Sequence, residues 1–333
     1  MSRSVSIVGA GAWGTAFSIH LARMGIKICL WVYEKDLYEI LKSSRENVYY
    51  LPGFILPQSL DFTTEIDFAA RYSEDIVVSV PSYALRQVLE MMKGSLREKR
   101  LLILTKGLES QTFKRMSEIA EEIISESETR IAVLSGPSFA KEVASGLFTS
   151  VVVASKEREC AKYFQNLVHS TNFRVYTTDD VIGVELGGAL KNVMAIGAGI
   201  IQGLSLGTNT LSAYLTRALA EMKRFGKALG AKESTFMGLS GIGDLILTSF
   251  GPLSRNRWFG MEIAKGGDPR KIVDSQRRVI EGYYTLNAVY KLSLKIGVEM
   301  PITSELYRIV YEGKNIKDSV RDITHREMKD EEI

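Results

Sequence analysis

The sequence predicts an α/β protein in which a Rossmann-type domain with a parallel sheet precedes an all-helical domain. Two observations predict this arrangement. Near-continuous apolar runs alternate with helical patterns in the first half, as in a parallel sheet covered by helices on both faces. Beyond about residue 180 the strand patterns stop and helical periodicity takes over. We therefore expect two domains, at residues 1–180 and 181–333.

The expected elements follow this division. Strands are expected at residues 5–8, 26–32, 76–80, 101–105, 131–134, 150–154 and 173–176, with helices between most of them, for example at 83–93 and 113–125. Helices alone are expected afterwards, at 181–203, 209–229, 257–265, 285–296 and 302–311. In such a sheet the ligand crevice lies at the carboxyl ends of the strands.

The first two strand runs enclose the most specific motif. Residues 9–14 read GAGAWG and lead into a helical pattern, and the second strand run ends at Glu34, twenty positions after Gly14. This is G-x-G-x-x-G in the strand–turn–helix–strand setting of dinucleotide-binding domains. Gly9 permits a tight turn, Gly11 lets backbone approach a pyrophosphate, and Gly14 lets helix and strand pack closely. The setting favours a dinucleotide site over a purely structural turn.

The composition limits the class of protein. Apolar residues make up 45% and charged residues 24%, which is typical of a soluble globular protein. The net charge of +3 is too small to favour nucleic acid or an anionic membrane. Cys29 and Cys160 lack metal-ligand spacing, so we expect no metal site, no disulfide and a reducing, cytoplasmic compartment. Residues 192–216 carry no charge, but their polar residues and glycines argue against a membrane helix.

The three histidines are weak candidates for acid–base chemistry. His20 is expected on the first helix, away from its apolar face, His169 before a strand, and His325 in a polar C-terminal region. We expect structural or solvent-facing roles for all three, so a different group should carry the proton chemistry.

Lys191 is the strongest candidate for that group. It is the only charged residue between Glu185 and Arg217, and Gly183 and Gly187 precede it by eight and four positions on one face of the predicted helix. That face is bare backbone beside an ammonium, which leaves room for a substrate or cofactor. A lysine whose alkyl chain crosses a packed helix to reach solvent would give the same pattern.

Weaker candidates lie at three other places. Lys106 stands where a strand opens into a loop, a common position for surface lysines. Asp244 lies beside glycines before an apolar run and could equally be a helix N-cap. Residues 254–257 read SRNR, which offers guanidinium groups suited to a phosphate or carboxylate but could also be an ordinary basic loop.

Over almost the entire chain these residues resemble the family of bacterial-type NAD(P)-dependent glycerol-3-phosphate dehydrogenases. The motifs that carry the resemblance are GAGAWGTAF at residue 9, VPSYALR at 80, TKGLE at 105, SGPSFAKEVASG at 135, DVIGVELGGALKNVMAIGAG at 180, GLSGIGDLILT at 238, SRNRWFG at 254, VIEGYYT at 279 and VEMPIT at 298. Such a set in this order is specific.

The resemblance implies an activity and a set of residues. It implies NAD(P)H-dependent reduction of dihydroxyacetone phosphate to sn-glycerol 3-phosphate, a precursor of membrane phospholipids, with Lys191 as proton donor and acceptor. The implied substrate-binding residues are Lys106, Gly136, Ser138, Lys191, Asp244, Ser254, Arg255 and Asn256. The implied cofactor-binding residues are Gly9, Gly11, Ala12, Trp13, Gly14, Tyr33, Lys106, Ala140, Arg255, Val279 and Glu281. The resemblance also suggests a homodimer formed through the helical domain.

The end of the second strand run departs from the family pattern. Members often carry Arg or His at the position of Tyr33, where a positive charge can meet the 2′-phosphate of NADP, and Ser at the position of Ala12. Glu34 suits the free 2′-hydroxyl of NAD and would repel the extra phosphate, although Lys35 could offset that repulsion. We expect use of NAD or of both coenzymes.

Two other functions are compatible with the residues. A dehydrogenase of the same two-domain plan that acts on a β-hydroxy acid or a keto acid would also carry a helical-domain lysine. Such an enzyme would have less need of the basic cluster at 254–257. A redox sensor that binds a dinucleotide without turnover would need neither Lys191 nor Asp244.

Overall fold

The structure is a computed structural model that describes residues 3–124, 128–325, 327 and 330–331. The chain forms two compact units. The first unit comprises Met1–Lys106 and Met116–Val184, and the second comprises Gly107–Arg115 and Glu185–Ile333. The expected assignment of cofactor binding to residues 1–180 and of substrate binding to residues 181–333 stays a prediction.

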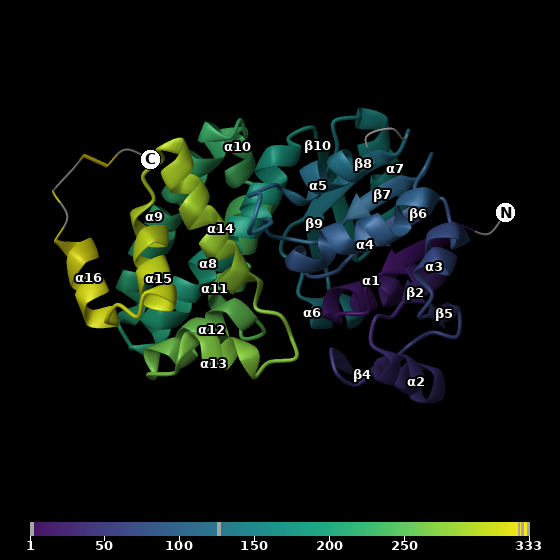
Figure 1. Cartoon of the computed structure of the whole chain (residues 1–333), viewed down its shortest axis with the longest axis horizontal. Helices are drawn as coiled ribbons and strands as arrows, with labels where there is room; N and C mark the ends of the chain where they lie inside the picture. The colour runs from purple at the N-terminus through teal and green to yellow at the C-terminus, as the bar shows by residue number, and fades with distance from the viewer. Residues whose placement is uncertain (1–2, 125–127, 326, 328–329, 332–333) are drawn as a thin grey trace. The chain divides into compact units, whose positions relative to one another are not determined.

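The first unit is built on one sheet with the strand order β10-β9-β8-β7-β6-β1-β2-β5 (Figure 1). Its strands are β1 (Ser4–Val8), β2 (Lys27–Trp31), β5 (Leu60–Thr63), β6 (Asp75–Val78), β7 (Arg100–Ile103), β8 (Arg130–Ser135), β9 (Thr149–Ala154) and β10 (Phe173–Thr178). A small antiparallel pair, β3 (Glu46–Asn47) and β4 (Leu51–Ile55), lies outside this sheet. All seven expected strands of the first half are confirmed.

Helices cover both faces of the sheet, which is why its strands read as nearly continuous apolar runs. They are α1 (Ala12–Arg23), α2 (Lys35–Ser44), α3 (Ile66–Tyr72), α4 (Leu85–Met92), α5 (Met116–Ile123), α6 (Ala140–Ala144) and α7 (Arg158–Val168). Alternate strand residues enter two apolar layers: Val5 and Ile7 pack with α1 and α7, whereas Val8 packs with α3, α4 and α5. Helices α1 and α6 lie side by side (Figure 1).

The expected parallel sheet contains one antiparallel pair that the sequence did not predict. Strands β8 and β9 run antiparallel, with Leu134 opposite Val153. The connection between them contains the five-residue helix α6 and little else that is regular, whereas a parallel return needs a crossover long enough to pack along the sheet. Edge strand β5 was not expected, because its sequence, LDFT, mixes apolar and polar residues without a clear run.

The second unit is helical, as expected. Helix α8 (Val181–Gly203) has the predicted bounds, and α9 (Gly207–Ala228), α12 (Arg255–Ala264), α14 (Glu281–Ile296) and α15 (Pro301–Tyr311) lie within a few residues of theirs. Five elements were not predicted: α10 (Glu233–Phe236), the π-helix η3 (Leu239–Gly243), α11 (Asp244–Phe250), α13 (Pro269–Asp274) and α16 (Ile316–Thr324). Most of these are too short to show a helical period.

One predicted helix of the first half starts late. The helix expected at 113–125 begins at Met116, because Phe113 adopts a left-handed conformation with φ +63° that ends the preceding turn. Ser125 lies outside the described residues.

Helix α8 is long and apolar enough to cross a membrane by length and composition. Its apolar window is wholly buried inside the protein, however, which is the pattern of a core helix. Within the described ranges, the segments Glu233–Phe250 and Arg255–Ala264 pass the same test only when counted as one span bent by 48°. The uncharged stretch 192–216 is divided between α8 and α9. These features are weak evidence for a membrane protein.

His20 is buried, so the expectation that it faces away from the apolar side of its helix is wrong. Its Nε2 donates to the Val168 carbonyl at 2.7 Å, and its ring centroid lies 4.4 Å from that of Phe173. Burial lowers the pKa of His20 below the usual 6.5, and nearby Arg23 lowers it further, although the bond to Val168 opposes this shift. The histidine has a structural role in the neutral form.

This burial predicts a loss of stability at acid pH. Because the folded-state pKa lies below the unfolded value of about 6.5, the unfolded chain binds more protons as the pH falls. The stability that His20 contributes is therefore present above about pH 6.5 and is lost below it, by at most about 1.4 kcal/mol per pH unit. In His20→Gln, whose amide can donate the same bond without titrating, the Tm should fall less between neutral and acid pH than in the wild type. The exposed His169→Gln serves as control, and an equal pH dependence of Tm in all three proteins would contradict the prediction.

Candidate active site

The glycine-rich turn between β1 and α1 has the expected geometry at two glycines. Gly9 has φ +115°, donates to the Trp31 carbonyl at 3.2 Å, and would place a Cβ 2.5 Å from the carbonyl oxygen of Ser79. A Cβ on Gly14 would lie 2.0 Å from the Gly9 carbonyl oxygen. The tight turn and the close start of the helix therefore both require glycine, as predicted.

At Gly11 the backbone is open. A Cβ built there would meet nothing within 4 Å. Gly11 is the N-cap of α1, and Ala12 and Trp13 are the first helical residues, so the N–H groups of the first helical turn follow directly after this open backbone. A helix N-terminus with open backbone before it fits the pyrophosphate of a dinucleotide.

Three predicted substrate residues of the first unit lie together. The Lys106 Nζ and the Ser138 hydroxyl both donate to the Gly136 carbonyl oxygen, at 3.2 and 2.9 Å. Gly136 has φ +133°, and a Cβ on it would lie 3.0 Å from the Cα of Val151. Lys106 and Gly136 follow the parallel neighbours β7 and β8, so they share the carboxyl edge of the sheet. Ala140 begins α6 shortly afterwards.

Lys191, the candidate proton donor, is buried in the second unit. Its Nζ donates to Asp244 Oδ1 at 3.0 Å and to Thr248 Oγ1 at 2.9 Å, and Thr248 donates to the same Asp244 oxygen at 3.2 Å. Only 11% of the Lys191 side chain and 1% of the Asp244 side chain are exposed. The alternative in which Lys191 reaches bulk solvent is therefore wrong. Asp244 is not an N-cap either, because Gly243 holds that position and the Asp244 carboxylate binds the lysine.

The pairing of these charges depends on a close approach of α8 to the π-helix η3. A Cβ on Gly187 would lie 2.4 Å from the carbonyl oxygen of Ser240. Lys191 follows Gly187 by about one turn, and Asp244 follows η3 directly. The expectation that Gly187 leaves room for a ligand is therefore wrong, since neighbouring backbone fills that space and so brings lysine and carboxylate together.

Asn256 connects α8 to the starts of α12 and α14. Its Nδ2 donates to Asn192 Oδ1 at 2.8 Å, and its Oδ1 accepts the Gly282 N–H at 2.9 Å. A Cβ on Gly282 would lie 2.5 Å from the Asn192 carbonyl oxygen, so glycine is required at this junction. The side chain of Asn256 is thus held in place by bonds within the protein through its oxygen and one of its two N–H donors.

The cluster at 254–257 is a capped helix start rather than an ordinary basic loop. The Ser254 hydroxyl accepts the Arg257 N–H at 3.2 Å, and Arg257 Nε donates to the Gln202 side chain. Arg255 is the exposed member, and its Nη1 donates to the Val279 carbonyl at 2.6 Å. The structure therefore brings together Arg255 and Val279, two predicted cofactor residues, and Glu281 begins α14 two positions later.

Sequence reasoning missed three residues of this network. Thr248 lies four positions after Asp244 on the same helix, so helical spacing could have identified it. Asn192 and Gly282 gave no such indication, because their partner Asn256 lies far away in the sequence.

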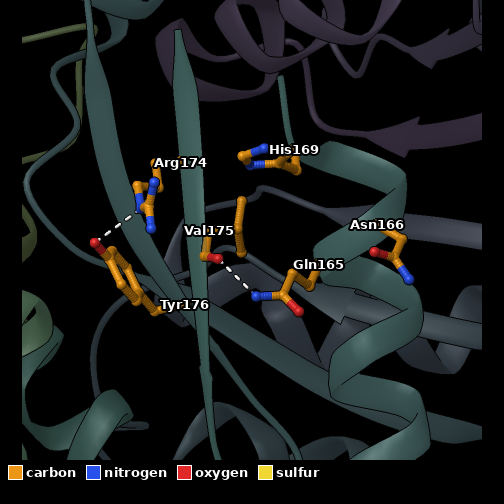
Figure 2. A pocket seen from close by; sticks show the side chains of 6 residues that line it. All are labelled: Gln165, Asn166, His169, Arg174, Val175 and Tyr176. Carbon is orange, nitrogen blue, oxygen red and sulfur yellow. Dashed lines mark hydrogen bonds between the residues drawn. The ribbon is translucent and has the colours of Figure 1, made fainter. Parts of the chain in front are cut away.

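A surface hollow of about 300 Å³ lies on the first unit, between the end of α7 and strand β10 (Figure 2). It is lined by Gln165, Asn166, His169, Arg174, Val175 and Tyr176. Its lining residues make two hydrogen bonds with one another. Gln165 Nε2 donates to the Val175 carbonyl at 2.7 Å, and Arg174 Nε donates to the Tyr176 hydroxyl at 2.9 Å. It contains no predicted site residue, and we assign it no part in the activity.

Comparison with known proteins identifies the family. Residues 4–161 match the description "NAD-dependent glycerol-3-phosphate dehydrogenase N-terminus", and residues 180–321 match that of the C-terminus. The chain belongs to this family.

Similar proteins cover the whole chain. Glycerol-3-phosphate dehydrogenase (NAD(P)+) from Aliivibrio fischeri is 43% identical over 330 residues, which cover 98% of this chain and 96% of that protein. The protein of the same name from a Thermoanaerobacter species is 44% identical over 329 residues, 98% of each chain. The crystal structure of glycerol-3-phosphate dehydrogenase from Coxiella burnetii matches with a TM-score of 0.94 and 37% identity, covering 98% of this chain and 99% of that one.

Gly187→Ala should destabilise the second unit and separate Lys191 from Asp244. The added Cβ would lie 2.4 Å from the Ser240 carbonyl oxygen, a backbone atom that cannot move without η3. We expect a loss of about 1–3 kcal/mol in the free energy of unfolding, together with a loss of turnover. Thermal unfolding and steady-state kinetics would measure both. Gly94→Ala, whose Cβ would meet nothing within 4 Å, is the matched control, and equal Tm values for the two variants would refute this packing argument.

Proposed function

We propose that this chain reduces dihydroxyacetone phosphate to sn-glycerol 3-phosphate with NADH or NADPH, and that Lys191 delivers the proton. Membership of the family and the similarity to glycerol-3-phosphate dehydrogenases over the whole chain support the reaction. The chain is an NAD(P)-dependent oxidoreductase that acts on CH–OH groups. The buried ammonium of Lys191, held by Asp244 and Thr248, is the observation that carries the residue assignment.

The cofactor is assigned to the glycine-rich turn. Gly9, Gly11 and Gly14 would hold the pyrophosphate against the start of α1, where the open side of Gly11 admits it. The other residues assigned to the cofactor are Ala12, Trp13, Tyr33, Lys106, Ala140, Arg255, Val279 and Glu281. When bound, the nicotinamide ring supplies the hydride that reduction adds to the ketone carbon.

Lys191 provides the other half of the reduction. As the ketone becomes an alcohol, negative charge develops on its oxygen, and an ammonium within hydrogen-bond reach stabilises that charge. The lysine then passes a proton to the oxygen and becomes a neutral amine, and it recovers a proton before the next turnover. Asp244 and Thr248 fix the position of Nζ. In the reverse reaction the neutral amine accepts the hydroxyl proton.

The substrate phosphate is assigned to the start of α12. Arg255 offers an exposed guanidinium there, which can make charge-assisted bonds to phosphate oxygens. Backbone N–H groups of the first helical turn add donors, and Ser254 and Asn256 fix that turn in place. Lys106, Gly136 and Ser138 are assigned to the triose.

The family evidence bears on both alternative functions. A sensor that never turns over would not need a buried lysine–aspartate pair, and a β-hydroxy-acid or keto-acid dehydrogenase would have less need of the basic cluster that contains Arg255. Membership of a glycerol-3-phosphate dehydrogenase family therefore agrees with the side chains at both places.

The same proposal includes an assembly and a cellular role. The resemblance supports a homodimer formed through the second unit, which sedimentation velocity would test. It also supports a cytoplasmic enzyme of glycerophospholipid synthesis that makes no integral membrane contact and binds no nucleic acid.

Lys191→Met should abolish most turnover while leaving cofactor binding intact. Loss of a positioned proton donor costs about 10²–10⁴-fold in rate, whereas Lys191 is not among the residues assigned to the cofactor. Turnover of dihydroxyacetone phosphate and the fluorescence of bound NADH would measure the two effects. Lys156→Met removes an exposed, surface-paired lysine and is the control.

A second variant separates chemistry from folding. Lys191→Met leaves Asp244 buried without its ammonium, which destabilises the fold. The double variant Lys191→Met, Asp244→Asn removes both charges, so it should regain Tm but not turnover. Near-normal turnover in either variant would refute the assignment of Lys191.

Arg255→Ala should weaken recognition of the phosphate. Removing a charge-assisted bond costs about 1.5–3 kcal/mol, or roughly 10–150-fold in kcat/KM for dihydroxyacetone phosphate. The small residual kcat/KM for unphosphorylated dihydroxyacetone should change much less. Arg270→Ala, at an exposed position on α13, is the control. An equal loss with both substrates would refute the phosphate contact of Arg255 and leave only its assignment to the cofactor.

A further inference from the structure

We propose that Tyr50 fixes the coenzyme preference of this chain in favour of NADH. Its hydroxyl holds Glu34, so that the carboxylate accepts the ribose 2′-hydroxyl of NADH and rejects the 2′-phosphate of NADPH. This inference rests on the proposed function, since it requires a dinucleotide at the glycine-rich turn. It goes further, because the names of similar proteins include both coenzymes.

Glu34 lies at the same edge of the sheet as the glycine-rich turn. Strands β1 and β2 are parallel neighbours with Val8 opposite Trp31, and the Gly9 N–H donates to the Trp31 carbonyl at 3.2 Å. Glu34 follows Trp31 by three residues and is the N-cap residue of α2. Its carboxylate therefore belongs to the edge where a bound dinucleotide would place its adenosine ribose.

The carboxylate of Glu34 is held by one neighbour. The Tyr50 hydroxyl donates to Glu34 Oε1. Glu34 Oε2 makes no hydrogen bond or ion pair with the part of the chain that the structure describes, so it can accept a hydroxyl from a ligand. The Glu34 side chain does not cap its own helix, which would otherwise turn it away from the edge.

Tyr50 is itself tied to the glycine-rich turn. The fully buried Asn47 donates from Nδ2 to the Ala10 carbonyl and to Thr15 Oγ1, both at 2.8 Å, and its Oδ1 accepts the Tyr50 N–H at 3.0 Å. Ala10 lies inside the glycine-rich turn. A continuous set of bonds thus runs from that turn through Asn47 to Tyr50 and on to Glu34, which gives the carboxylate a defined place relative to the cofactor turn.

The cations near this edge do not provide a ready site for a 2′-phosphate. Arg45 donates to the carbonyls of Leu56 and Leu60, at 3.1 and 2.9 Å, and to that of Pro57, so its guanidinium is engaged with backbone. Tyr33 is neutral and 74% exposed. Lys35 is exposed and adjacent to Glu34, so it could reduce the repulsion of a phosphate by the carboxylate.

The test is direct titration of the full chain with each coenzyme. Fluorescence of bound NADH and NADPH gives both Kd values without turnover, for the wild type and for Tyr50→Phe, Glu34→Gln and the double variant. We expect the wild type to bind NADH about tenfold or more tightly than NADPH. Glu34→Gln should remove most of this ratio, and Tyr50→Phe should reduce it about fivefold, as expected for loss of one bond to a charged group.

The design separates a positioning role from a general effect on the fold. If Tyr50 acts through Glu34, the double variant should show the same ratio as Glu34→Gln alone. Tyr38→Phe removes a hydroxyl from a partly buried tyrosine on α2 and should leave the ratio unchanged. Tyr50→His keeps a donor and should retain part of the preference.

Two results would overturn the inference. One is wild-type binding of NADPH that equals or exceeds that of NADH. The other is a Tyr50→Phe variant, folded as judged by its Tm, that keeps the wild-type ratio while Glu34→Gln loses it. Failure of the proposed function would look different, since either neither coenzyme would bind or both would bind without turnover of dihydroxyacetone phosphate.

Discussion

The buried pair of Lys191 and Asp244 is the constraint on which the second unit depends. Removing an ammonium and a carboxylate from water costs several kcal/mol per ion, and their attraction offsets this only with good geometry and further hydrogen bonds. The structure provides both, at 3.0 Å between the charges and with Thr248 bonded to each. Charge pairs of this kind are weak stabilisers, so placing one in a core fits a requirement of chemistry better than one of folding.

The same constraint explains why glycines and amides gather around the lysine. Helix α8 and the π-helix must approach until backbone touches backbone, which Gly187 permits. Asn192, the residue after Lys191, accepts a bond from the Asn256 side chain, which in turn accepts the Gly282 N–H. The amide of Asn256 therefore fixes the starts of α12 and α14 to α8. Irregular helical turns are common at functional sites. Here the π-helix directly precedes Asp244, whose carboxylate bonds to Lys191.

The sequence predicted what local patterns determine and missed what tertiary packing determines. The predicted strands were correct because burial on both faces makes their sequences continuously apolar. The predicted roles of Gly9 and Gly14 were correct because the conformation of a tight turn depends on the residues within it. Lys191 stood out because it is a lone charge in an apolar helix. The antiparallel β9 and the filled space at Gly187 could not be predicted, since each depends on a segment that is distant in sequence or on the length of a connection. The predicted position of His20 was wrong for the same reason, because its hydrogen-bond partner Val168 lies 148 residues away in the sequence.

The proposals for coenzyme choice and for proton transfer rest on different parts of this chain. Glu34, Tyr50 and Asn47 belong to the first compact unit, whereas Lys191, Asp244 and Thr248 belong to the second, and the two sets share no residue. Each set is internally bonded, so a substitution that alters one leaves the bonds of the other unchanged. Effects on free energy add when two sets of residues share no partners and do not touch. If both proposals hold, substitutions at the end of β2 can change the preference between NADH and NADPH, while Lys191 stays under the separate and stricter constraint of its buried pairing with Asp244.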